Sequence, residues 1–360
     1  MDEYFSPDYV TARRRFREAA AQAGGKMDAL GLEARGPNGE DLTIDIAWFG
    51  SQTPHRVLVH SSGLHGVEGF AGSAIQLQWL RDGIPTPHTD HAILLVHVLN
   101  PWGMAWLRRF NEHNVDLNRN FLGPGEPFNG APDGYVALND FLNPATPPSH
   151  DFFYARALPL LLRHGMPAMR QAVAGGQYDY PQGLFFGGAR VEPGPARFQS
   201  YLADRLSGAA RITAIDVHTG LGAFGQDCLL VDATEQRSAA CHAMQAAFGD
   251  PVQRSNSEES VAYKVRGAQE SMYFRLFPGA EVYFATQEFG TYRAIAVLAA
   301  LRAENRWHHY GGGSVRHPTK VRLREVFGPD RFDWREAVLR RGRQVIRQAL
   351  LLAFPLQTSS

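Results

Sequence analysis

The chain has 360 residues, of which 44% are hydrophobic and 20% charged, as in ordinary globular proteins. It could form one large α/β domain or two smaller ones. Its formal net charge is zero, which argues against nucleic acid or an anionic membrane as a partner. No apolar run reaches the ~18–20 residues of a membrane-spanning helix, and the acidic N-terminus lacks the features of a signal peptide. We therefore expect a cytoplasmic protein.

The first fifty residues predict a helix followed by a β-hairpin. Ser6 is expected to cap a helix over residues 9–24, with Pro7 at its first position. Residues 28–36 and 41–50 alternate apolar and polar side chains on either side of a Pro-Asn-Gly turn. This pattern is typical of two paired strands.

The next part of the chain alternates buried strands with a helix. Residues 55–62 form a short β-branched run, residues 70–83 have helical periodicity, and residues 91–100 predict a second buried strand. This βαβ order implies parallel strands. Later strands are expected to end at His218 and Glu288. We predict an α/β fold with a central mixed, largely parallel twisted sheet flanked by helices.

A long segment interrupts the sheet pattern. Residues 122–150 are rich in Gly, Pro and Asn and predict a surface excursion, which a helical segment over residues 151–174 continues. The sheet pattern then resumes, and the chain closes with an amphipathic helix over residues 329–354. We therefore predict a single domain over residues 1–360 with an insertion at about 122–200.

Polar residues at predicted strand ends suggest a metal site. His65 and Glu68 follow a buried strand, and none of the other thirteen histidines has a Glu at the same spacing. Ligands bind at the carboxyl ends of parallel strands, and catalytic zinc takes three protein ligands, so His218 could complete a site with this pair. Asp216 shares a strand face with His218 and is expected to be its hydrogen-bond partner. An H-x-x-E pair alone is a weak signal, and a hydrogen-bonded loop is the alternative.

Two further segments contain candidate functional residues. Adjacent Asn118 and Arg119 can clamp a carboxylate, although a turn-capping Asn beside a salt-bridged Arg would look the same. Glu288 is expected to project from a strand end, where a carboxylate beside a metal site can act as a general base. The alternative for Glu288 is an ordinary surface glutamate.

In their order along the chain, these motifs resemble the zinc carboxypeptidase family. They are the H-x-x-E pair, N-P-x-G at 100–103, D-x-N-R-N at 116–120, the strand-end histidine and the final strand with Glu288. The matched motifs span about 55–125 and 210–292, and the resemblance implies the fold of that family. The related succinylglutamate desuccinylase and aspartoacylase branch shares H-x-x-E and D-L-N-R.

The resemblance assigns a cofactor and a base. It implies one Zn²⁺ per chain, the His₂Glu ligand set being the one quoted for carboxypeptidase A. The ligands would be His65, Glu68 and His218. Glu288 would be the general base.

The resemblance also assigns substrate contacts. Asn118 and Arg119 would hold the terminal carboxylate of the substrate. An arginine upstream of them should polarise the scissile carbonyl; Arg109 is preferred for this role, and its neighbour Arg108 is expected to contact substrate. The mobile tyrosine of the family has three weak candidates, Tyr263, Tyr283 and Tyr292.

We therefore predict a zinc-dependent hydrolase that cleaves an amide bond near a free carboxylate. The first expectation is a carboxypeptidase-type metallopeptidase acting on a peptide. An N-acyl amino acid deacylase of the same fold is an alternative, and a catalytically inactive binding protein is an alternative of another class. A serine hydrolase is disfavoured because the sequence has no G-x-S-x-G motif. The oligomeric state does not follow from the sequence.

Overall fold

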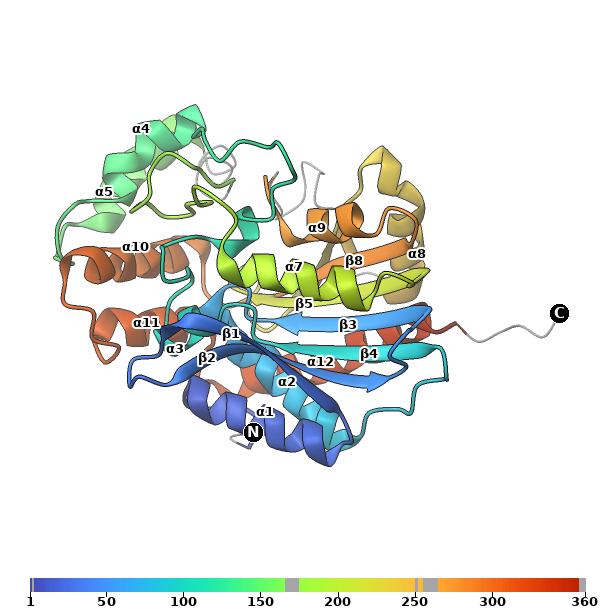
Figure 1. The fold of residues 1–360 in the computed structure, drawn as a ribbon. Coiled ribbons are helices and arrows are strands. Elements are labelled where there is room, and N and C mark those ends of the chain that lie inside the picture. Colours follow the sequence, from blue (N-terminus) through green and yellow to red (C-terminus); the bar gives the residue numbers. More distant parts are fainter. Residues whose placement is uncertain (2, 166–174, 250–251, 255–264, 356–360) are drawn as a thin grey trace.

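A mixed eight-stranded sheet forms the centre of the computed structural model, which describes residues 1, 3–165, 175–249, 252–254 and 265–355 (Figure 1). The strands are β1 (Lys26–Arg35), β2 (Asp41–Gly50), β3 (Arg56–Ser62), β4 (His91–His97), β5 (Arg211–Thr219), β6 (Asp227–Val231), β7 (Val252–Arg254) and β8 (Glu281–Phe289). Their order across the sheet is β1-β2-β4-β3-β5-β8-β6-β7. The four central strands β4, β3, β5 and β8 run parallel, whereas β1, β2 and β6 each have an antiparallel neighbour. The predicted α/β fold with a mixed, largely parallel sheet is confirmed.

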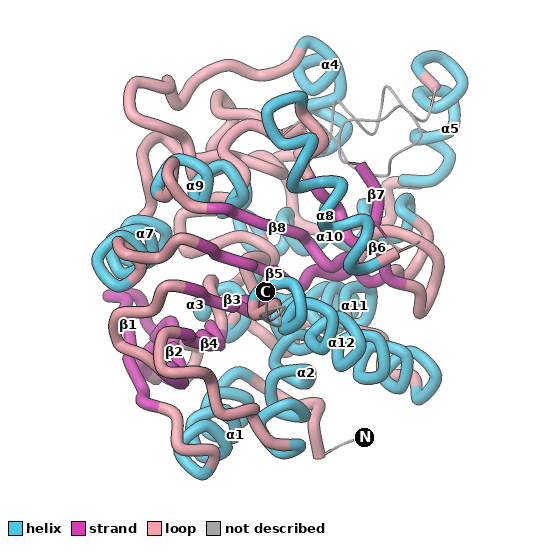
Figure 2. Tube along the Cα trace, turned by 90° about the vertical axis from the view of Figure 1, so that its right-hand side faces the viewer, coloured by secondary structure: helices cyan, strands magenta, loops and turns pink. Residues whose placement is uncertain are grey.

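Helices cover both faces of the sheet (Figure 2). One face packs against α1 (Tyr9–Gln22), α2 (Gly69–Asp82), α8 (Ser238–Phe248) and α12 (Phe332–Ala353). The other packs against α7 (Pro193–Arg205) and α9 (Gln269–Leu276). Because both faces are covered, β3 and β4 are buried along almost their whole length, which explains their continuous apolar runs. None of the helices in the described ranges has the length and apolar character needed to cross a membrane.

The remaining helices lie toward the carboxyl ends of the central strands (Figure 1). They are α3 (Pro101–Ala105), α4 (Asp133–Leu142), α5 (Phe153–His164), α10 (Ala294–Tyr310) and α11 (Pro318–Phe327). The hydroxyl of Thr219, at the end of β5, donates to the carbonyl of Phe327, the last residue of α11, over 2.5 Å. This bond ties α11 to the sheet end at which the predicted site residues lie.

The expected hairpin is present as the antiparallel pair of β1 and β2. The helix before it begins at Tyr9, as predicted, but its N-cap residue is not the predicted one. Ser6 is not the cap: Asp8 holds that position, and its carboxylate accepts the Thr11 N–H over 2.7 Å. Pro7 therefore lies outside the helix. Ser and Asp are equally good caps, so only the point at which the backbone turns into the helix decides between them.

Part of the segment predicted as an insertion, here still called the insertion, is buried instead of forming a surface excursion. Helices α4 and α5 lie at the rim, with exposed apolar side chains on α5. Residues 176–178 and 183–188 are buried. The Asp116 N–H donates to the Phe186 carbonyl over 2.7 Å, so this segment packs against the loop that contains the D-x-N-R-N motif. The predicted helix over residues 151–174 is present as α5, and residues 166–174 lie outside the described ranges.

Replacing Asp8 tests the observed cap. Asp8→Ala should lower the free energy of unfolding by about 1 kcal/mol, because the Thr11 N–H loses its acceptor. Asp8→Asn should retain the stability of the parent protein, because Asn caps equally well. Urea denaturation of the two variants and the parent measures this difference. Equal losses in the two variants would show that the charge of Asp8, and not its capping bond, is what matters.

Candidate metal centre

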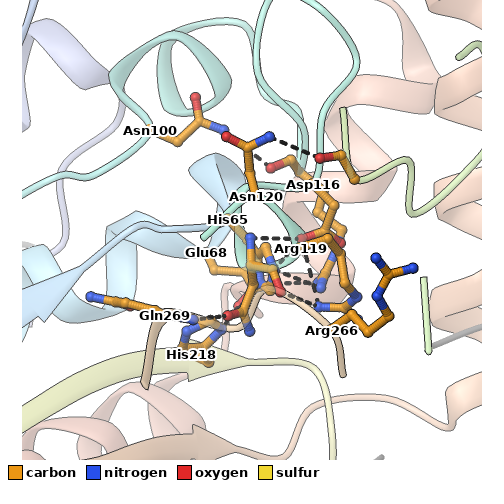
Figure 3. Close-up of polar contacts among 12 residues, drawn as sticks. His65, Glu68, Asn100, Asp116, Arg119, Asn120, His218, Arg266 and Gln269 are labelled. Atoms are coloured by element: carbon orange, nitrogen blue, oxygen red, sulfur yellow. Dashed lines mark hydrogen bonds and ion pairs between the residues drawn. The ribbon is translucent and has the colours of Figure 1, made fainter. Parts of the chain in front are cut away.

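Three buried side chains from two strand ends converge on one point (Figure 3). His65 follows β3, Glu68 lies in the short 3-10 helix Gly66–Glu68, and His218 is near the end of β5. The Nδ1 atom of His65 lies 3.0 Å from Glu68 Oε1 and 3.1 Å from the Nδ1 atom of His218. His218 Nδ1 is 3.4 Å from Glu68 Oε2. In the described part of the chain, this is the one buried group of His, Cys, Asp and Glu donors close enough to share a metal ion.

Two glycines allow the loop after β3 to fold this way. Gly63 has a φ of +66°, and a β-carbon there would lie 2.6 Å from the Cβ of Val98. A β-carbon on Gly66 would lie 2.1 Å from the backbone of Gly103. The loop therefore packs directly on the backbone that follows β4, and larger residues could not occupy these positions. This close packing brings His65 and Glu68 to the same side as His218.

A buried carboxylate orients each imidazole ring. His218 Nε2 lies 2.6 Å from Asp216 Oδ2, as predicted, and Asp216 Oδ1 accepts the Ser61 hydroxyl over 2.5 Å. His65 Nε2 lies 3.0 Å from Asp116 Oδ1. Arg109 Nη2 also lies 2.7 Å from His65 Nε2. In the tautomer in which Nε2–H donates to the carboxylate, the Nδ1 atom of either ring presents a lone pair to the shared point. Two imidazole nitrogens and a carboxylate oxygen are the donor types of a catalytic zinc site.

The charges around the centre keep its carboxylates ionised. Burial alone would raise the pKa of Glu68, but His65, His218 and Arg109 outweigh it and lower that pKa well below its usual range. Burial likewise opposes ionisation of Asp116, whose pKa Arg109, Arg119 and His65 lower. For His218, burial lowers the pKa, and Asp216 and Glu68 raise it well above the ordinary value. The carboxylates of the centre are thus ionised and compensated by the cationic side chains around them.

Glu288 lies beside this centre without joining it. It pairs with His218 in the register of the parallel strands β5 and β8 and is 5% exposed. Its Oε1 atom accepts the Leu221 N–H over 3.0 Å. Burial, with the negative charge of Glu68 next, raises the pKa of Glu288 to about 8. The neighbouring strand thus presents a second carboxyl group, held apart from the donors, next to the shared point.

The adjacent arginines 108 and 109 point in opposite directions. Arg109 contacts the centre: Nη1 lies 2.8 Å from Glu68 Oε1, and Nε lies 3.1 Å from Asp116 Oδ2. Arg108 is fully buried and bonds Glu304 instead. The structure therefore does not bring Arg108 to the predicted substrate side, because its charge is compensated inside the protein.

Asn118 and Arg119 lie next to Asp116 and outside the group of three converging donors. The Asn118 side-chain oxygen accepts the Gln269 N–H over 3.0 Å. Arg119 is 4% exposed, and its Nη1 atom donates to the Asn118 carbonyl over 2.9 Å and lies 3.9 Å from Asp116 Oδ1. Tyr178, from the insertion, donates to the Arg119 carbonyl over 2.8 Å. The pair is thus adjacent to the carboxylate that orients His65.

A family model described as "Protein of unknown function (DUF2817)" matches residues 5–341. The chain belongs to the DUF2817 family. A search of curated protein sequences gave no match.

Several solved structures are similar to this DUF2817 chain at low identity. Carboxypeptidase A from Helicoverpa armigera is 14% identical, with a TM-score of 0.46, over 90% of this chain and 74% of that one. Bovine thrombin-activatable fibrinolysis inhibitor is 11% identical, with a TM-score of 0.46, over 96% and 99%. A succinylglutamate desuccinylase from a Silicibacter species is 15% identical, with a TM-score of 0.40, over 80% and 67%. Both groups named by the motif resemblance thus occur among the similar structures.

Sequence analysis missed Asp116 as the partner of His65. Asp116 is the first residue of the D-x-N-R-N motif that also contains Asn118 and Arg119, so the motif itself points to it. Of the three tyrosine candidates, Tyr292 donates to Glu325 over 2.5 Å, and Tyr283 lies on β8 under the Arg211 guanidinium. Tyr263 lies outside the described residues.

Proposed function

We propose that this DUF2817 protein is a zinc-dependent hydrolase that cleaves an amide bond next to a free carboxylate, as a carboxypeptidase-type peptidase. The observation that carries this proposal is the convergence of His65, Glu68 and His218, whose donor atoms lie 3.0 to 3.4 Å from one another. Nitrogen donors favour zinc over Mg²⁺ and Ca²⁺, which prefer all-oxygen sites. The carboxylates behind both rings support the same conclusion, because ligating histidines usually have such partners.

The residues around the centre can divide the work of hydrolysis. A zinc ion held there would polarise the substrate carbonyl and bring the pKa of an attacking water toward ~7. In its ionised form, which a cation at the centre would favour by offsetting the charge of Glu68, Glu288 would take a proton from that water and pass it to the leaving nitrogen. Arg109, beside the centre, would donate to the carbonyl oxygen as negative charge develops there. The burial of these side chains strengthens each of these charge interactions.

The substrate carboxylate would be bound by Asn118 and Arg119. A guanidinium is better suited to a carboxylate than to a neutral amide, because two parallel N–H groups match its two oxygens. An N-acyl amino acid deacylase is the second candidate, because residues 116–119 read D-L-N-R as in the desuccinylase and aspartoacylase branch. A substrate panel of peptides and N-acyl amino acids separates the two activities.

Metal content tests the proposed ligands. Protein purified without added zinc should hold one zinc per chain, and His65→Ala or His218→Ala should remove it, because each loses one of three protein ligands. Elemental analysis of the folded variants measures this. His242→Ala changes an exposed histidine of α8 and should retain the metal.

A second group of possible metal donors, of which His88 is exposed and the other two are half-buried, requires a control in this measurement. The donor atoms of His88, Asp90 and His91 also lie close together. Repeating the measurement in a His88→Ala background removes any zinc held there. A full equivalent of zinc in His65→Ala or His218→Ala within that background would contradict the proposed centre.

Replacing Glu288 tests the proposed base. Glu288→Gln should keep the metal, because Glu288 is not one of the converging donors, and should lower kcat by a factor of ~10²–10⁴. Glu281→Gln is the matched control: it lies at the other end of β8, is largely exposed, and should leave kcat unchanged. Steady-state kinetics on one substrate compare the two. Wild-type activity in Glu288→Gln would place the base elsewhere.

Replacing Arg119 tests the substrate class. A charge-assisted hydrogen bond is worth ~1.5–3 kcal/mol, so Arg119→Ala should lower kcat/KM by roughly one to two orders of magnitude on a substrate with a free carboxylate. The loss should be much smaller on the amidated analogue, because that substrate lacks the bonded group. Measuring both substrates with both proteins gives the comparison. Equal losses on the two substrates would mean that Arg119 serves the fold or the carbonyl.

A further inference from the structure

A fully buried ion triad lies behind the loop that holds His65 and Glu68. Glu304 of α10 accepts from Arg108 Nε over 2.9 Å and from Lys320 Nζ of α11 over 2.6 Å. Arg108 and Glu304 are 0% exposed, and Lys320 is 1% exposed. Burial lowers the pKa of Lys320 to about 8, with Glu304 acting in the opposite direction. None of these three groups belongs to the converging donors.

The backbone of Arg108 and Arg109 is hydrogen-bonded to the loop over residues 65–68, which we call the metal-ligand loop. The Val67 N–H donates to the Arg108 carbonyl over 2.8 Å, and the Gly66 N–H donates to the Arg109 carbonyl over 3.2 Å. Gly66 and Val67 are the only two residues between His65 and Glu68 in the sequence. The position of the backbone at 108–109 therefore sets the position of both ligands.

The same guanidinium reaches the loop that orients His65. Arg108 Nη2 donates to Asn114 Oδ1 over 2.8 Å and to Asn305 Oδ1 of α10 over 2.9 Å. Asn114 has a φ of +62° and donates through its side chain to the Gly183 carbonyl over 3.0 Å. Asp116, two residues further on, bonds His65. The side chain of Arg108 thus connects α10, the insertion and the loop with Asp116.

Stability alone does not account for this triad. Apolar side chains of similar volume often serve stability as well as a buried ion group does. Charged groups bonded at several points, however, fix one geometry, since each alternative position leaves a buried charge unpaired. We propose that Arg108, Glu304 and Lys320 are positioning residues that hold the His65–Glu68 loop and Asp116 in the metal-binding arrangement. This inference rests on the proposed metal centre, whereas hydrogen exchange in the metal-free protein tests it independently of that centre.

Three variants separate positioning from general stability. Glu304→Gln removes the central charge. The triple variant Arg108→Met, Glu304→Leu, Lys320→Met replaces the triad by apolar side chains and should fold even if the single variant does not. Arg302→Met is the control, because Arg302 is also a buried arginine of α10 and is bonded to Asp151 over 2.5 Å, away from the ligand loop.

Zinc affinity is the first readout. Competition with a chromophoric chelator, well below the unfolding temperature, should show zinc binding weakened 10- to 100-fold in Glu304→Gln and in the triple variant, the range typical for residues behind metal ligands. The control should stay within twofold of the parent protein. Unchanged affinity in the triad variants, or an equal loss in the control, would overturn the proposal.

Hydrogen exchange in the metal-free protein is the second readout. Mass spectrometry of a peptide covering residues 63–69 should show at least tenfold faster exchange in the triad variants, because the Gly66 and Val67 amides lose fixed acceptors. A peptide covering β4 is the internal reference and should not change. If His218→Ala left zinc affinity intact, the metal centre would be wrong, and exchange alone would decide on the triad. Parent-like exchange over residues 63–69 would overturn it.

Discussion

The close approach of two imidazole nitrogens is the constraint on which the site depends. Nδ1 of His65 and Nδ1 of His218 lie 3.1 Å apart, and the other nitrogen of each ring is next to a buried aspartate. Two lone pairs at this distance repel each other unless a proton or a cation lies between them. The parallel pairing of β3 with β5 brings the rings together, and the bend at Gly63 turns His65 toward His218. A cation is the partner that this set of donors favours.

The adjacent residues Arg108 and Arg109 pair with different carboxylates. Arg109 contacts Glu68 and Asp116, whereas Arg108 turns into the triad with Glu304. A side chain that contacts the converging donors and a side chain that is paired in the interior thus share one stretch of backbone. The carbonyls of that stretch accept the Gly66 and Val67 amides, so the position of the segment from His65 to Glu68 depends on the backbone of both arginines. The cost of burying several charges is offset because each is paired and hydrogen-bonded.

The sequence predicted the sheet and the convergence of His65, Glu68 and His218, because both follow from the pattern of buried strands. Apolar runs bounded by glycine and proline mark buried strands, and parallel strands place their carboxyl ends together. The cap of α1 was missed because Ser6 and Asp8 are equivalent in type and two residues apart. The direction of Arg108 was missed because it depends on Glu304, which is remote in sequence. Burial of residues 183–188 was missed because glycine-rich segments look alike whether they cover a surface or pack inside.

The insertion belongs to the site and is not an appendage, although the motif resemblance does not extend to it. Tyr178 bonds the Arg119 carbonyl, and Gly176 lies so close that a β-carbon there would be 2.6 Å from the Cδ of Arg119. Phe185 places its ring against the Arg109 guanidinium, 5.5 Å from ring centroid to Cζ. The two arginines to which we assign substrate contacts are therefore held by residues of the insertion. Changes of sequence there would alter the position of Arg109 and Arg119 without touching His65, Glu68 or His218, so under the proposed function the insertion would influence substrate preference and leave the proposed metal centre unchanged.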